Sequence, residues 1–419
     1  MAEQVVAEKV EQPEAPAPQP TQPKEHWWDR LIVPVLAVVT ALAIGALVIV
    51  FSDTDILKSW SGFFVHPVDT LRISGRAIWD SYYALFTGAF GSPTELWRGI
   101  TSGSWAEFQN ALYPLSETIV TATPLIFAGL AVAIGFHAGL FNIGAEGQIT
   151  VGAVVAAAVG FSFPGLPGFL HVILIVLAGF AGGAVWGFIP GILKAKTGAH
   201  EVIVTIMLNW ISYPLAFYFL SHSFFQRPGR TDPISKPVHG AFPLLLGSGL
   251  RVHAGILLAL LVAAAVGFLI YRTTNGFEFR AVGANPDAAR AAGISPARTY
   301  VLVMTLAGGI AGLAGSNQLL SVTPSLTPGF SSGFGFDAIA LALLGRSNPW
   351  GVAAAALLFG AMRAGSRAMQ AATATPVDIV VVIQALVIVF IAAPSLVRAI
   401  YRIKVKRPEG LEILTKGLA

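Results

Sequence analysis

The chain has 419 residues, of which 55% are hydrophobic and only 11% charged, and its mean hydropathy is +0.70. Soluble domains carry about 25% charged residues, so this composition excludes a soluble globular protein. The net charge is +4, but the basic residues lie in loops without interleaved aromatic residues, and no nucleic acid partner is expected. The chain has no cysteine, which excludes disulfides, a thiol nucleophile and thiolate metal ligands; no metal site is expected.

Residues 1–30 form a polar segment rich in Glu, Gln, Pro and Ala, and this composition predicts a disordered tail. Residues 31–51 then predict a first transmembrane helix, since the run is too long for a cleaved signal peptide. Nine further apolar segments follow, at 118–136, 148–166, 169–193, 202–220, 254–271, 299–315, 336–345, 349–364 and 377–397. The sequence predicts an all-α polytopic membrane protein with about ten membrane segments, some of them broken or re-entrant.

Basic residues next to the apolar segments predict the orientation of the chain in the membrane. They gather before the first segment, in the loop 272–298 and in the tail 398–419, so these three regions and both termini are expected in the cytoplasm. Residues 52–117 then lie outside. Apolar residues at near-helical spacing between Pro67 and Phe86 predict a helix in the outer interface, and the alternative is a partly structured solvent-exposed loop. Residues 118–397 form the transmembrane core.

Glycines at four-residue intervals predict close helix packing in this core. Gly183, Gly187 and Gly191 form one set, and Gly308 and Gly312 form another. Small residues let helix backbones approach each other in lipid. Two further glycine-rich interruptions, 135–147 and 329–351, indicate paired broken helices.

Polar residues in and near these interruptions are the candidate substrate pathway. Irregular backbone within the membrane is tolerated where it is buried in protein or lines an aqueous cavity. Asn142 and Glu146 are therefore predicted to face the pathway, with Phe136 as an aromatic wall. The alternative for Glu146 is a helix cap or a position at the cytoplasmic surface.

Three further polar residues complete the predicted pathway: Asp337 in the second interruption, and Asn209 and Asn317 elsewhere in the core. Each has a structural alternative, because buried amides often join helices and Asp337 could belong to an ordinary turn. The spacing of glycines around Ser331 also resembles a hydrolase nucleophile turn, but no strand precedes it. No catalytic residue and no ATPase site is predicted in this chain.

A short capped helix is predicted in the cytoplasmic loop. Asn285 is a good N-cap, Asp287 favours the positive end of the helix dipole, and Gly293 supplies a left-handed stop. We interpret this helix, with Arg290 on it, as a docking element for a soluble motor protein. The alternative is a capped surface helix with no partner.

The spacing of Asp287, Ala288, Ala289 and Gly293 resembles the loop of ABC importer permeases that contacts the ATPase. Together with residues 139–148, 205–209, 276–283 and 340–346, it resembles the nucleoside or simple-sugar branch of the ribose and branched-chain amino acid permease superfamily. The resemblance covers roughly residues 117–394. It implies an importer for nucleosides, or alternatively simple sugars, in the bacterial plasma (inner) membrane.

The resemblance also implies the partners of this chain. These are a cytoplasmic ABC ATPase that holds ATP and magnesium, a second and homologous permease, and an extracytoplasmic substrate-binding protein. This chain itself is expected to hold no cofactor. Two rival hypotheses are an ion-coupled secondary transporter, in which Glu146 or Asp337 binds the ion, and an intramembrane hydrolase using Ser331.

Overall fold

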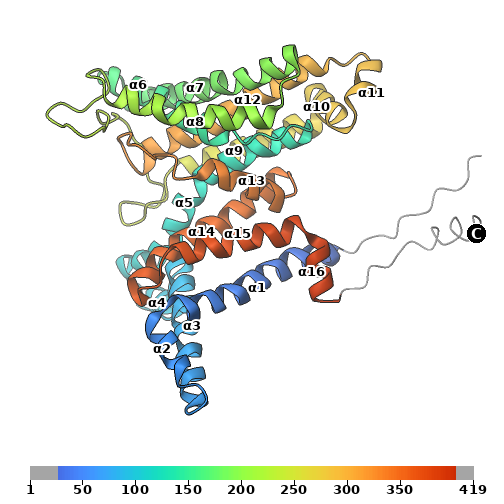
Figure 1. The fold of residues 1–419 in the computed structure, drawn as a ribbon. Helices are drawn as coiled ribbons and strands as arrows, with labels where there is room; N and C mark the ends of the chain where they lie inside the picture. The colour runs from blue at the N-terminus through green and yellow to red at the C-terminus, as the bar shows by residue number, and fades with distance from the viewer. Residues whose placement is uncertain (1–26, 403–419) are drawn as a thin grey trace, which may run out of the picture.

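The computed structural model describes residues 27–402, and helices dominate this part of the chain (Figure 1). The tail residues 1–26 and 403–419 lie outside the described residues. Seven helices are long and apolar enough to cross a membrane: α1 (Trp27–Ser52), α5 (Trp105–His137), α6 (Ala145–Ser162), α7 (Gly168–Thr197), α8 (Glu201–Leu220), α9 (Gly255–Arg272) and α12 (Pro296–Ser321). The bent pair of α15 (Asp378–Ala392) and α16 (Pro394–Ile400) would make an eighth. The prediction of an all-α polytopic membrane protein is confirmed.

The eighth predicted segment is a short helix, and the ninth is longer than predicted. Helix α13 (Phe334–Leu344) has 11 residues, about 16 Å at 1.5 Å per residue, which is too short to cross the membrane alone. Helix α14 (Pro349–Thr373) continues beyond the predicted end at Ala364. Arg363 and Arg367 interrupt the apolar run near that point. Inside the fold Arg363 is paired with Asp337, so the helix need not end at a charge.

Helix α5 is the central element of the molecule. It has 33 residues, and 89% of its most apolar window is buried. It begins at Trp105, thirteen residues before the predicted segment, and Ser104 caps its first turn; Glu107, Gln109 and Asn110 make this part less apolar than the segment that follows. Helices α6, α7, α8 and α12 lie on one side of it, and α1, α3, α14 and α15 on the other (Figure 1).

Glycines on α7 and α12 allow these two helices to touch along their backbones. A Cβ at Gly183 would overlap the Gly308 carbonyl oxygen, and a Cβ at Gly187 would overlap the Met304 carbonyl oxygen. The predicted close packing is therefore confirmed. Because apolar burial does not drive helix association in lipid, this contact relies on dispersion between closely spaced backbones.

The segment between α1 and α5 is helical. It contains α2 (Thr54–Ser61), α3 (Pro67–Phe90) and α4 (Pro93–Thr101), so the predicted helix from Pro67 is confirmed and ends four residues later than expected. Trp79 and Trp97 are 68% and 69% exposed, as expected for side chains in a headgroup layer. Placement in the interface itself remains a prediction.

The connection between α9 and α12 holds two short helices, α10 (Thr274–Ala284) and α11 (Pro286–Ala291). They lie at the same end of the bundle as α16 and the start of α1, whereas α2 to α4 lie at the opposite end (Figure 1). The basic regions that predicted the orientation thus share one end in their described parts. This agreement supports the predicted orientation.

Candidate functional site

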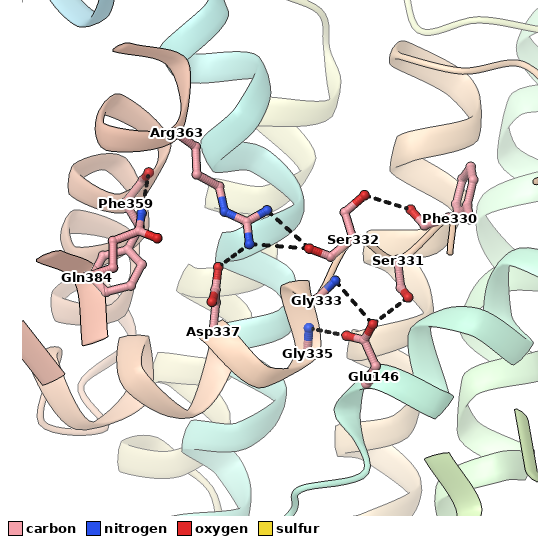
Figure 2. A network of polar contacts seen from close by, with 10 residues as sticks. All are labelled: Glu146, Phe330, Ser331, Ser332, Gly333, Gly335, Asp337, Phe359, Arg363 and Gln384. Carbon is pink, nitrogen blue, oxygen red and sulfur yellow. Dashed lines mark hydrogen bonds and ion pairs between the residues drawn. The ribbon is translucent and has the colours of Figure 1, made fainter. Parts of the chain in front are cut away.

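Glu146 is the centre of a buried polar network between two broken segments of the chain (Figure 2). It lies in the first turn of α6 and is 2% exposed. Its Oε2 accepts a hydrogen bond from the Gly335 amide at 2.7 Å, and its Oε1 accepts one from the Gly333 amide at 3.2 Å. The hydroxyl of Ser331 donates to the same Oε1 at 2.5 Å. A buried carboxylate is thereby satisfied almost entirely by another segment of the chain.

The donors to Glu146 belong to the start of α13. Gly333 is the N-cap of this helix, and its φ of +76° is in the left-handed region. A Cβ at Gly335 would overlap the Glu146 backbone nitrogen, so only glycine permits this approach. The first amides of a helix lack intrahelical acceptors and carry a partial positive charge. Glu146 therefore caps α13 from a different helix, which is the structural alternative given above, although it lies in the protein interior and not at the surface.

An ion pair connects the same helix to α14. Arg363 Nη2 lies 2.6 Å from Asp337 Oδ2, and the two side chains are 24% and 21% exposed. The guanidinium also donates to the Ser332 carbonyl oxygen at 3.3 Å and lies over the Phe334 ring, 4.9 Å from its centroid. Arg363 thus holds both the loop before α13 and the first turn of α13 (Figure 2). Charged side chains within membrane-spanning bundles normally face protein or an aqueous cavity.

Asn142 and Asn209 brace the break between α5 and α6. Asn142 is fully buried; its Oδ1 accepts from the Gly144 amide and its Nδ2 donates to Gln148 Oε1, both at 3.0 Å. Asn209, from α8, accepts from the Gly147 amide at 2.8 Å and donates to the Ile143 carbonyl at 2.9 Å. These contacts correspond to the structural alternative for amides. Their predicted contact with substrate remains a prediction.

The two other predicted pathway residues lie away from Glu146. Phe136 packs against Phe141, with ring centroids 5.2 Å apart, and both line a pocket of about 310 Å³ with Leu343, at the other end of α13. Asn317 is fully buried on α12, and its amide faces Gly255 and His253. The structure therefore brings Glu146 and Asp337 together at the start of α13 and places Phe136 near the end of that helix.

A cavity of about 520 Å³ lies beside Glu146 on the side away from Phe136. Its walls come from α6, α8 and the connection before α13, and include Thr150, Tyr213, Phe217, Phe330 and Ser331. The Tyr213 hydroxyl lies 3.5 Å from Glu146 Oε1. Sequence reasoning missed Tyr213 and Arg363. Tyr213 lies one helical turn after Asn209 and could have been found on that face. The pairing of Arg363 with Asp337 joins two separate helices, and no local pattern indicates it.

The predicted docking helix has the expected caps. Asn285 Oδ1 accepts from the amides of Asp287 and Ala288 at 2.9 and 3.0 Å, Pro286 begins α11, and Gly293 has a φ of +84°. Asp287 and Arg290 form an exposed pair, with side chains 88% and 68% exposed. The local structure is confirmed, and the docking role is a proposal.

Discontinuous helices inside a multi-pass bundle are typical of the binding sites of membrane transport proteins. Residues 115–392 match the family described as the branched-chain amino acid transport system / permease component. The chain belongs to this family. The resemblance inferred from the sequence motifs is thereby confirmed.

Several characterised permease proteins are similar to this chain. The guanosine ABC transporter permease protein NupP of Bacillus subtilis is 36% identical, covering 88% of this chain and 95% of the relative. The nucleoside ABC transporter permease protein NupB of Lactococcus lactis is 34% identical, covering 80% and 89%. The glucose ABC transporter permease protein TsgB13 of Haloferax volcanii is 32% identical, covering 87% of each chain. No match among solved structures is significant.

Proposed function

We propose that this chain is the permease subunit of an ATP-driven ABC importer that moves nucleosides across the bacterial plasma membrane. The observation that carries the proposal is the buried junction at Glu146, where two broken membrane segments meet beside a cavity in a chain of the permease family. The names of the relatives NupP and NupB support nucleosides as the substrate class. Glu146 and Asp337 fix the discontinuous helix of the pathway, and Asn142 and Asn209 brace it.

The partners follow from the same proposal. A cytoplasmic ABC ATPase would bind ATP and magnesium, a second permease would complete the pathway, and an extracytoplasmic protein would deliver the substrate. Helix α14 supports the second permease: Arg363 is partly exposed, and Arg367 and Gln370 are exposed on the same helical face. A face with these charges is unsuited to lipid, so it should meet another subunit or an aqueous path.

Helices α10 and α11 would carry the motion of the ATPase into the membrane. The exposed pair Asp287 and Arg290 offers a rigid contact for the ATPase. At the end of α10, Gly283 packs against the turn after α5: a Cβ built at Gly139 would lie 3.3 Å from the Gly283 Cα. That turn leads through Asn142 to Glu146. A displacement of α10 is therefore transmitted to the junction through contacts between main-chain atoms.

The docking role is tested by Asp287→Trp. We expect normal membrane insertion and loss of most of the ATPase that co-purifies with the complex, because a bulky ring on α11 prevents close contact. A matched control is found at the opposite end of the helix bundle. Asp55→Trp changes an exposed aspartate that likewise pairs three residues on, with Lys58 on α2. Equal ATPase recovery for the two variants would contradict the docking role.

Simple sugars are the second candidate substrate class, favoured by the similarity to TsgB13. Uptake by the complete transporter in proteoliposomes, containing receptor, both permeases and ATPase, separates the two. We expect ATP-dependent accumulation of at least one of tritiated guanosine, adenosine, uridine and cytidine, and none of glucose. Accumulation of glucose alone would replace the proposal with the sugar function. Accumulation driven by an ion gradient without ATP would support a secondary transporter.

A further inference from the structure

The cavity beside Glu146 has an aromatic wall on α8. Trp210, Tyr213 and Phe217 recur at intervals of three and four residues and so share one face of the helix. The rings of Trp210 and Tyr213 meet edge to face, with centroids 5.9 Å apart. Tyr213 and Phe217 line the cavity, and Phe330 lines it from the connection before α13. Phe217 is 52% exposed in the isolated chain, so no other residue of the chain covers most of its ring.

The polar groups of the cavity are hydroxyls. Thr150 Oγ1 donates to the Glu146 carbonyl oxygen at 2.9 Å, and Ser331 donates to the Glu146 carboxylate. Each oxygen therefore keeps lone pairs that can accept a hydrogen bond from a solute hydroxyl. The hydrogen bond from the Tyr213 hydroxyl to Glu146 is long, at 3.5 Å, so this hydroxyl can turn to donate to a closer acceptor.

The charges around the cavity exclude an anionic solute. Its lining consists of uncharged residues from α6, α8 and residues 326–331. The charge next to this lining is the Glu146 carboxylate, and the Arg363 guanidinium nearby is neutralised by Asp337. A phosphate group would find no unpaired cation in the lining and would be repelled by Glu146.

We infer that this cavity is the binding site that the solute occupies during transport, and that it takes a neutral solute with a flat aromatic part and several hydroxyls. A nucleoside has this chemistry. A nucleotide carries the negative phosphate charge that the cavity would exclude, and a simple sugar lacks the aromatic part. The base stacks on Phe217, and the ribose hydroxyls bond to Thr150, Tyr213 and Ser331. The inference rests on the proposed function and adds the residues that select the substrate. The volume of about 520 Å³ is within the range of small-molecule sites.

The test compares variants of the complete transporter with the same receptor and ATPase. Phe217→Leu removes the ring, and we expect uptake of the transported nucleoside to fall roughly tenfold, the size of one lost base–aromatic contact. Phe217→Trp restores a ring and should recover most of the uptake. Tyr213→Phe removes one hydroxyl and should lower uptake severalfold.

Two controls make the same changes away from the cavity. Tyr218→Phe removes a hydroxyl from the next helical turn of α8, and Phe268→Leu removes an exposed ring from α9; neither residue lines the cavity. Both should transport as the unsubstituted chain does. Uptake is normalised to the amount of monodisperse complex, so a folding defect is not mistaken for lost binding.

The results separate the two proposals. If the unsubstituted transporter accumulates no nucleoside, the proposed function fails regardless of the variants. If it accumulates a nucleoside and the Phe217→Leu and Tyr213→Phe variants match their controls, the cavity is not the site. Equal losses in Phe217→Leu and Phe217→Trp would also overturn the inference, because the ring would then not be what the solute contacts.

Discussion

Glu146 shows how one residue can hold two distant parts of this chain together. Its carboxylate accepts main-chain hydrogen bonds from Gly333 and Gly335, which begin another helix. Glu146→Gln keeps the shape but turns an NH₂ group toward one of these donors. We expect a loss of about 1–3 kcal/mol in stability, the cost of a buried donor without an acceptor, together with reduced uptake per folded molecule. Thermal unfolding in detergent and vesicle uptake measure the two effects.

The control for this substitution is Glu107→Gln. Glu107 is an exposed carboxylate in the first turn of α5, where its charge favours the helix dipole but no buried donor depends on it. A melting temperature as low for Glu107→Gln as for Glu146→Gln would show that loss of charge, and not loss of the buried junction, explains the effect.

His253 makes stability depend on pH. Burial lowers its pKa to about 4, and nearby Arg251 adds to the effect. Its Nδ1 accepts from the Gly255 amide at 3.1 Å, which requires an unprotonated nitrogen. Between pH 6.5 and about 4, His253 stays neutral in the folded state, whereas in the unfolded state it binds a proton below its usual pKa of 6.5. This contribution to stability is therefore fully present above pH 6.5 and is lost as the pH falls toward 4.

His253→Asn should reduce this pH dependence, because asparagine offers an acceptor and does not titrate. Melting temperatures of the variant and the unsubstituted chain, taken between pH 4.5 and 8, would converge at low pH. Exposed His239→Asn serves as the control. A slope between pH 4.5 and 6.5 that His253→Asn leaves intact would assign the effect to other groups, such as the Glu117 and Arg251 ion pair beside it.

At the scale of helices, the α7 and α12 contact has no room for a side chain. Gly183→Ala places a methyl group on the Gly308 carbonyl oxygen. We expect a loss of about 1–3 kcal/mol from this overpacking, seen as a lower melting temperature and a smaller monodisperse fraction. Gly168→Ala, at the start of the same helix, meets no atom within 4 Å and should be neutral. A neutral Gly183→Ala would mean that the helices lie farther apart.

Helices also show which parts of the structure could be predicted from the sequence. The caps of α11 were predicted because neighbouring residues determine them. The glycine spacing on α7 and α12 predicted close packing, but not that these two helices pack against each other. The junction of Glu146 with Gly335 was not predicted, because it joins residues 189 positions apart and no local pattern records it. The two interruptions were recognised separately. Only the fold shows that one caps the other and that Arg363 neutralises Asp337.

At the scale of the whole molecule, the absence of cysteine allows a clean test of orientation. A single cysteine at exposed Ser61 on α2 and another at exposed Ala292 after α11 lie at opposite ends of the bundle (Figure 1). We expect an impermeant maleimide to label Ser61→Cys in intact cells and Ala292→Cys only after permeabilisation. The reverse pattern would place α11 outside the cell, where no ATPase could reach it.

The main-chain bonding of Glu146 has a consequence for how the pathway opens. Side-chain rotamers change in picoseconds to nanoseconds, but rotating Glu146 away would leave a buried carboxylate and the amides of Gly333 and Gly335 without partners. Separating α6 from α13 would break these hydrogen bonds, so it is disfavoured compared with a movement of both helices as one rigid unit. The two should therefore travel together, and the passage should widen by retreat of α8, on the microsecond to millisecond timescale of collective helix movement.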